Sequence, residues 1–249
     1  MWGLITVLVD SLIPRLREIF ELTYFQAGLV QFAFFIAYGL VSIPAGRLLQ
    51  RIGYQSGIIV GLTVMGIGCL LFLPAASLRW YELFLLAYFI LASGMTLLQV
   101  AANPFVTVLG EPATAASRLN LSQAFNSLGT TVAPALGAIF ILSDSVLSSD
   151  ELARLDQSSK SAYFSIEAAA VQEPFLILAL TLFLLAGVTL KSQLPKLLKG
   201  SPDSHYAQVI KNKKLAQGAL AIFVYVGAEV TIGSYLINYF LDMNLAEQI

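Results

Sequence analysis

Five long stretches of the chain contain no Asp, Glu, Lys or Arg, and they restrict the folds that it can adopt. These stretches are residues 25–46, 52–78, 83–110, 119–143 and 174–190. A helix needs about 20 residues to cross a hydrocarbon core about 30 Å thick. Four stretches reach that length, and the fifth does so with Val171 and Gln172 counted. Residues 215–241 are interrupted only by Glu229, and residues 1–14 contain Asp10, so the sequence predicts seven spanning helices with the first truncated.

The composition agrees with an integral membrane protein. Hydrophobic residues make up 57% of the 249 positions and charged residues 12%, about half the fraction of a soluble domain. A β-barrel would show short alternating segments, which are not seen in this sequence. A signal peptide is disfavoured because the N-terminus has no basic region and no small-residue cleavage site. The apolar composition makes the lipid bilayer the expected partner, and the net charge of −1 offers no basic field for nucleic acid.

The chain has few residues that could support catalysis. Its single cysteine, Cys69, lies in an apolar stretch, and its single histidine, His205, lies in a lysine-rich segment. A zinc site or a histidine-based triad needs partners that are not present beside them. We therefore expect no enzyme activity, no metal site and no cofactor.

The basic residues predict the orientation in the membrane. One set of alternate loops carries nine of them and the other set carries five. The nine are Arg47, Arg51, Arg118, Lys191, Lys196, Lys199, Lys211, Lys213 and Lys214. The positive-inside rule places these loops in the cytoplasm of a cell inner (plasma) membrane. The acidic, serine-rich residues 144–170 are then expected to form a mobile outer loop.

The order of the segments predicts the domain organisation. Residues 1–190 are expected to form a six-helix half, residues 191–214 a basic cytoplasmic linker, and residues 215–249 the first helix of a second half. Transporters built from two six-helix halves bind substrate between the halves near the bilayer midplane. We expect a sequence that lacks roughly 10–30 residues upstream and about five spans downstream.

Polar side chains inside the spans are the candidate functional residues, because each is costly in lipid. Asp10 and Glu229 are the two carboxylates, although one of them near a membrane face would be solvated and idle. Gln99 and Asn103 are spaced i, i+4. Further along, Asn120, Gln123 and Asn126 advance by threes, so each set shares a helix face. Such faces can line a wet cavity, or they can form interhelical hydrogen bonds.

Several motifs resemble one transporter family. LLQVAANPFVTVLG at residues 97–110 and SRLNLSQAFNSLGTTVAP at residues 117–134 resemble spans four and five of the fucose/glucose/galactose branch of the major facilitator superfamily. QFAFFIAYGLVSIPAGRLLQRIGY at residues 31–54 resembles its second span and following loop. YVGAEVTIGSYLINY at residues 225–239 resembles its seventh span. The resemblance covers nearly the whole chain and implies an all-α membrane protein with the fold of this superfamily.

The resemblance also implies roles for individual residues. Asp10 would be the carboxylate on which cation coupling depends. Gln99 stands where fucose permeases carry a sugar-facing glutamate, and Glu229 stands where they carry glutamine, so both favour the glucose/galactose type. Gln123 and Asn126 match amides that line the sugar cavity, and Asn103 is placed with them.

The loop after the second span is expected to help the conformational switch. Gly46, Arg51 and Gly53 fit the family's tight basic turn, although Gln50 replaces a usual aspartate.

The expected function is symport of a hexose with H+ or Na+ by alternating access. The expected sugar is glucose or galactose, with fucose as a further candidate. The complete protein is expected to be a monomer. Alternatives are a superfamily transporter of another small polar solute, a seven-helix receptor, and, least favoured, an intramembrane enzyme.

Overall fold

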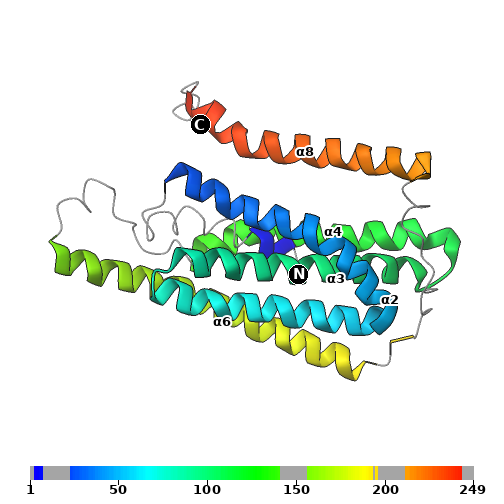
Figure 1. The fold of residues 1–249 in the computed structure, drawn as a ribbon, viewed down its shortest axis with the longest axis horizontal. Coiled ribbons are helices and arrows are strands. Elements are labelled where there is room, and N and C mark those ends of the chain that lie inside the picture. The colour runs from blue at the N-terminus through cyan, green and yellow to red at the C-terminus, as the bar shows by residue number, and fades with distance from the viewer. Residues whose placement is uncertain (1–2, 8–22, 141–155, 193, 196–210, 243–249) are drawn as a thin grey trace. The chain divides into compact units, whose positions relative to one another are not determined.

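A computed structural model describes residues 3–7, 23–140, 156–192, 194–195 and 211–242 of the chain. Every regular element among these residues is helical, as the sequence predicts. The chain divides into two compact units, residues 1–200 and residues 201–249, which we describe separately. In the first unit, helix α2 packs against α3 and α6, and α3 packs against α4 (Figure 1).

Helix α2, Tyr24–Ser77, contains two of the predicted spans (Figure 1). It begins with a capping box, in which Thr23 accepts a hydrogen bond from the Gln26 backbone and the Gln26 side chain accepts one from Thr23. The helix is broken at one residue, Gly53, whose φ of 80° and ψ of 170° lie outside helical space. Only glycine adopts these angles readily, so Gly53 turns the chain between the two spans.

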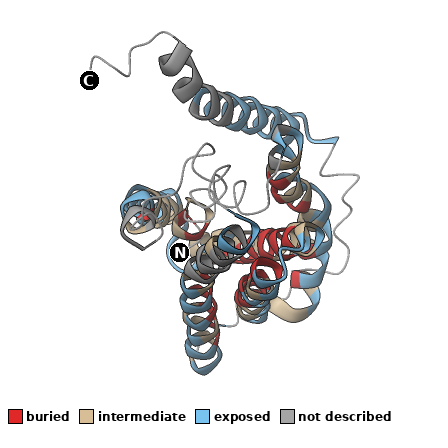
Figure 2. Ribbon diagram, turned by 90° about the vertical axis from the view of Figure 1, so that its left-hand side faces the viewer, coloured by how far each residue is buried: buried red, intermediate tan, exposed pale blue. Residues whose placement is uncertain are grey.

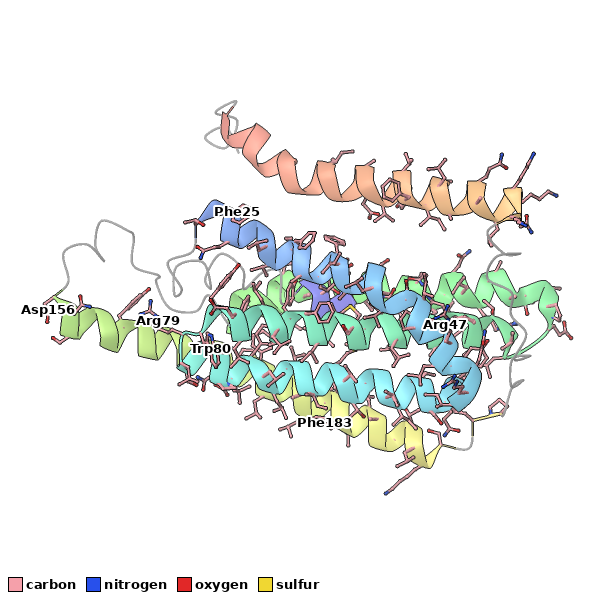
Figure 3. The ribbon with its side chains drawn as sticks, viewed as in Figure 1. Phe25, Arg47, Arg79, Trp80, Asp156 and Phe183 are labelled. Carbon is pink, nitrogen blue, oxygen red and sulfur yellow. The ribbon has the colours of Figure 1, made fainter. Side chains whose placement is uncertain are left out.

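A tight turn connects α2 to α3, which runs from Tyr81 to Val108. The Trp80 amide donates to the Ala75 carbonyl over 3.0 Å, and Arg79 has a φ of 48°. Figure 3 places Arg79 and Trp80 at the same end of this unit as Phe25, and Arg47 toward the other end. The Tyr81 hydroxyl donates to the Gln26 carbonyl over 2.8 Å, which ties the start of α3 to the start of α2.

Glycines bring the second part of α2 into close contact with α3. A Cβ built on Gly61 would lie 2.9 Å from the Leu98 nitrogen, and one on Gly68 would lie 2.7 Å from the Leu91 nitrogen. From the other side, a Cβ on Gly94 would lie 2.5 Å from the Met65 nitrogen. Small residues allow such backbone approach where lipid supplies no hydrophobic drive between helices. We call these three glycines the glycine seam.

Helix α6, Gln157–Lys191, covers the second part of α2 through aromatic packing. The fully buried Phe175 stacks on Phe72, with ring centroids 4.1 Å apart and planes 15° apart. At the opposite end, the Gln55 amide donates to the carbonyls of Thr189 and Ser192 over 2.9 and 2.8 Å. Those oxygens lie at the end of α6, where the last carbonyls of a helix have no backbone N–H partner within it. Gln55 therefore caps a neighbouring helix.

Helix α4, Ala115–Phe140, follows α3 through a short 3-10 turn, Pro112–Thr114. Arg118 reaches back from α4 and donates to the Val106 and Thr107 carbonyls over 3.1 and 2.6 Å. It also contacts the Glu111 carbonyl and the Thr114 hydroxyl. A guanidinium at the carbonyl end of α3 satisfies unpaired oxygens and complements the helix dipole.

The outer surfaces of the first unit are apolar. Along α6, Leu180, Leu184 and Val188 are 60%, 67% and 58% exposed, while the opposite face of the same helix is buried. Figure 2 shows this division, with buried positions where helices face one another and exposed positions outside. An exposed face as apolar as the buried one is typical of a helix in lipid.

The described residues test part of the span prediction. By length and composition, three helices in the described ranges can cross a membrane. They are residues 28–77 of α2, which contain two predicted spans, Tyr81–Val108, and residues 172–191. The fifth and seventh predicted spans are helices α4 and α8, Lys213–Asp242. The first is described only at residues 3–7, which are helical. The count of seven therefore stays a prediction.

One local expectation is wrong. Residues 157–170 belong to α6 rather than to a mobile loop, because the segment holds good helix formers, including Ala168–Ala170. The turn after the second span consists of a single non-helical residue. Gly46 and Arg51 lie inside α2, and only Gly53 departs from helical angles.

The second unit contributes helix α8, whose residues 213–229 are all exposed. The predicted boundaries at residues 190 and 214 remain a prediction, and most of the predicted linker, residues 196–210, lies outside the described part of the chain.

Candidate functional site

Gln99 is the predicted site residue with the best-defined surroundings. It lies on α3, partly buried, and its Nε2 donates to the hydroxyl of Tyr38 on α2 over 2.9 Å. On α3 the neighbouring Leu98 and Ala101 are 5% and 0% exposed. The pair is therefore a polar contact in apolar surroundings, where a hydrogen bond is stronger than in water.

Asn103 lies one helical turn after Gln99 on α3 and is also partly buried. Its side chain makes no hydrogen bond to any residue that the structure describes. Pro104 follows it without ending the helix, which continues to Val108. Gln99 and Asn103 therefore lie one turn apart on the same helix, as predicted, and Asn103 has no side-chain partner within the described ranges.

The two predicted amides of α4 differ in their partners. Asn126 Oδ1 accepts a hydrogen bond from the backbone nitrogen of Gly3 over 2.7 Å. Gln123, one turn earlier and partly buried, has no hydrogen bond within the described ranges. Asn120, one further turn away, is exposed. The polar face of α4 thus changes from exposed to partly buried along its length.

The short helix 3–7 connects the amides of α4 to those of α3. A Cβ on Gly3 would lie 2.6 Å from Asn126 Oδ1, so only glycine fits there. Three residues later, the Thr6 hydroxyl donates to the sulfur of Met95 over 3.3 Å. Met95 precedes Gln99 by one turn of α3. The structure therefore places the Asn126 side of α4 and the Gln99 side of α3 around one short helix.

The structure leaves the two predicted carboxylates untested. Asp10, the candidate for cation coupling, lies outside the described residues, and the sequence places it four residues after Thr6. Glu229 lies on α8 in the second unit and is exposed. Its role, and the roles of Gly46, Arg51 and Gly53 in switching, stay predictions.

The described site consists of amides and hydroxyls. Gln99, Asn103, Gln123 and Asn126 provide neutral donors and acceptors, and no cluster of three His, Cys, Asp or Glu residues that could hold a metal occurs in the described ranges. Groups of this kind bind a neutral polyhydroxyl solute by hydrogen bonds without charging it.

Two residues of this site, Tyr38 and Thr6, are not predicted from the sequence. The available signal was that each carries a hydroxyl in an apolar stretch, which usually needs a hydrogen-bond partner when buried.

This fold and its amide-lined helices define the class of protein. The Major Facilitator Superfamily model matches residues 3–247, so the chain belongs to that family, whose members are multi-pass membrane transporters rather than enzymes.

Particular relatives are similar over nearly the whole chain. The glucose/galactose transporter of Brucella abortus (strain 9-941) is 51% identical over 249 residues, which are 99% of this chain and 57% of the relative. The L-fucose-proton symporter of Escherichia coli (strain K12) is 38% identical over 251 residues, 97% of this chain and 57% of that protein. The chain thus spans a little over half the length of these curated relatives.

Solved structures agree with these relatives. A crystal structure of the E. coli fucose:proton symporter superposes with a TM-score of 0.86 at 36% identity, over 97% of this chain and 60% of that one. A second structure, of a superfamily transporter in the outward conformation, gives a TM-score of 0.86 at 37% identity over the same shares. The predicted fold class and family are therefore confirmed.

Proposed function

We propose that this chain provides the first six-helix half, a linker and the seventh helix of a transporter that moves a hexose by alternating access. The observation that supports the proposal is the set of neutral amides on α3 and α4. Asn126 of α4 and Met95, one turn before Gln99 on α3, both contact the helix 3–7. Amides and a phenol suit sugar hydroxyls, because each sugar oxygen both donates and accepts hydrogen bonds. The 51% identity to a glucose/galactose transporter supports a hexose as the solute.

The proposed binding residues are Gln99, Asn103, Gln123 and Asn126 of the first half, with Glu229 of the seventh helix. Gln99 cannot carry a proton, so the sugar contact on α3 does not change charge during the cycle. Glu229 would add an acceptor from the second half. A sugar held by both halves favours their closure around it, which is how ligand binding drives rocking of the halves.

Asp10 is the proposed coupling residue. A carboxylate at membrane depth is costly while charged, so a bound cation lowers the free energy of closing a dry path over it. The fucose-proton relatives favour H+ as the coupled ion, and Na+ would need several further oxygen ligands. The protein is proposed to lie in the cell inner membrane, with the loops that carry nine of the basic residues in the cytoplasm. No further cofactor is proposed.

The function is tested in a chimera, in which residues 1–249 replace the matching 57% of the Brucella transporter. The chimera is expressed in bacteria that lack their own hexose uptake, and accumulation of labelled glucose, galactose and fucose is measured. We expect concentrative uptake of glucose or galactose, abolished by a proton uncoupler and accompanied by alkalinisation of a weakly buffered medium. No hexose uptake by a chimera that reaches the membrane, beside an active parent, would refute the proposal.

The coupling role is tested by Asp10→Asn in the same chimera. We expect accumulation against a gradient to be lost while counterflow exchange of labelled for unlabelled sugar continues, because the neutral amide mimics the loaded carboxyl. Asp144→Asn, which changes a carboxylate in a predicted outer loop, is the matched control. Concentrative uptake that survives Asp10→Asn would remove Asp10 from the coupling mechanism.

A further inference from the structure

We propose that Tyr38 is a positioning residue for sugar selection, because its hydroxyl fixes the amide of Gln99 so that Oε1 is presented to a sugar hydroxyl. The inference rests on the proposed hexose transport and adds a residue from a third element, α2, to the site. The observation is the hydrogen bond of 2.9 Å from Gln99 Nε2 to the Tyr38 oxygen, which joins residues 61 positions apart.

The Tyr38 ring is itself held in place. It packs against Phe34, one turn earlier on α2, with ring centroids 5.3 Å apart. Phe34 is only 7% exposed and packs in turn against the fully buried Tyr88 of α3 at 5.3 Å. A phenol fixed by two successive aromatic contacts offers its oxygen at one position, with little of the rotational freedom of an exposed side chain.

The direction of the hydrogen bond to this oxygen shows which way the Gln99 amide points. A primary amide has a donor end and an acceptor end, and rotation of the terminal group exchanges them. Because the Tyr38 oxygen accepts from Nε2, the donor end faces α2 and the acceptor Oε1 is left for another partner. Without the phenol oxygen, either end of the amide could face the sugar, so the site would discriminate less well between hydroxyl orientations.

The apolar surroundings make the hydrogen bond effective. Leu97 and Leu98 of α3 are 6% and 5% exposed, and Val41 of α2 packs against the buried cluster that contains Leu97. Among the residues that the structure describes, the Tyr38 oxygen is the hydrogen-bond partner of this amide. The consequence is a site whose acceptor is oriented before the sugar arrives, and such preorganisation lowers the cost of binding.

The test compares Tyr38→Phe with Tyr81→Phe in the chimera described above. Both variants remove one hydroxyl that joins α2 to α3, since the Tyr81 hydroxyl donates to the Gln26 carbonyl over 2.8 Å. For Tyr38→Phe we expect the KM for hexose uptake to rise about three- to tenfold, with little change in maximal rate per transporter. We also expect weaker discrimination between glucose and galactose as competitors. Tyr81→Phe should leave both properties unchanged.

A double variant separates positioning from general packing. If Tyr38 acts only through Gln99, Tyr38→Phe should change the KM by less than about twofold when Gln99→Leu is already present. Additive effects of the two substitutions, or an unchanged KM in Tyr38→Phe, would overturn the inference. If Tyr38→Phe does not reach the membrane, Tyr38→Met is measured in its place with the same expectation. Loss of all hexose uptake by the unsubstituted chimera would instead refute the proposed function.

Discussion

Substitution of Gly94 by alanine tests the close packing of α2 against α3. The added Cβ would lie 2.5 Å from the Met65 nitrogen and 2.8 Å from the Gly61 carbonyl oxygen. Both are main-chain atoms, so rotation of a side chain cannot relieve the overlap. Ordinary contact begins at about 3.4 Å, so the helices must separate by nearly 1 Å at this level.

A second variant isolates the cost of that separation. Gly187 lies on α6, is exposed, and has no atom within 4 Å of its added Cβ. Both substitutions gain the same helix propensity of about 1 kcal/mol, so their difference reports packing alone. Overpacking of this kind costs about 1–3 kcal/mol. We expect Gly94→Ala to fall near the upper end, because separation also loosens the buried side chains on either side of the glycine seam.

The assay is reversible unfolding of the purified chain in mixed dodecylmaltoside and SDS micelles, followed by far-UV circular dichroism. We expect Gly94→Ala to unfold at a lower SDS fraction than Gly187→Ala, by about 2–3 kcal/mol in the free energy of unfolding. Equal stability of the two variants would show that the helices are not in backbone contact at Gly94. The close packing described for the glycine seam would then be refuted.

Substitutions at three other positions test the packing and the caps, two of them in the same unfolding assay and the third by hydrogen exchange. Arg118→Ala should cost about 1–3 kcal/mol by exposing carbonyls at the end of α3, and Arg118→Lys should recover less than half of this because one ammonium replaces a planar fork. Phe175→Ala should cost about 3–5 kcal/mol, since its buried ring stacks on Phe72. Gln55→Leu should increase amide hydrogen exchange in the last turn of α6 by about tenfold or less, with little effect elsewhere.

Each of these expectations has a contrary result. Full stability of Arg118→Ala would show that water caps α3 equally well. A cost below about 1 kcal/mol for Phe175→Ala would contradict its complete burial. Faster exchange throughout α6 in Gln55→Leu would point to global loosening rather than to a lost cap.

The sequence predicted most helices well because charges are excluded from lipid. The charge-free residues 83–110 correspond to Tyr81–Val108, and residues 52–78 to the second part of α2. The same rule failed for α6, since charges mark where lipid ends and not where a helix ends. The helix begins at Gln157, well before the apolar run starts at Pro174.

The candidate site was predictable within a helix but not between helices. Spacing placed Gln99 and Asn103 on one face, because the helical period is a local property. The partner of Gln99 is Tyr38, 61 residues away, and only the packing of α2 on α3 brings the two together. Similarly, nothing in the local pattern indicates that the Gly3 backbone would occupy the oxygen of Asn126.

The single break at Gly53 has a mechanical consequence. Only one non-helical residue connects the two parts of α2, so the connection is too short to let one part slide along the other. Gly53 can act as a hinge, because a small change in its φ and ψ angles moves the far end of a long helix by a large distance. Tilting of the pair is therefore much easier than relative translation.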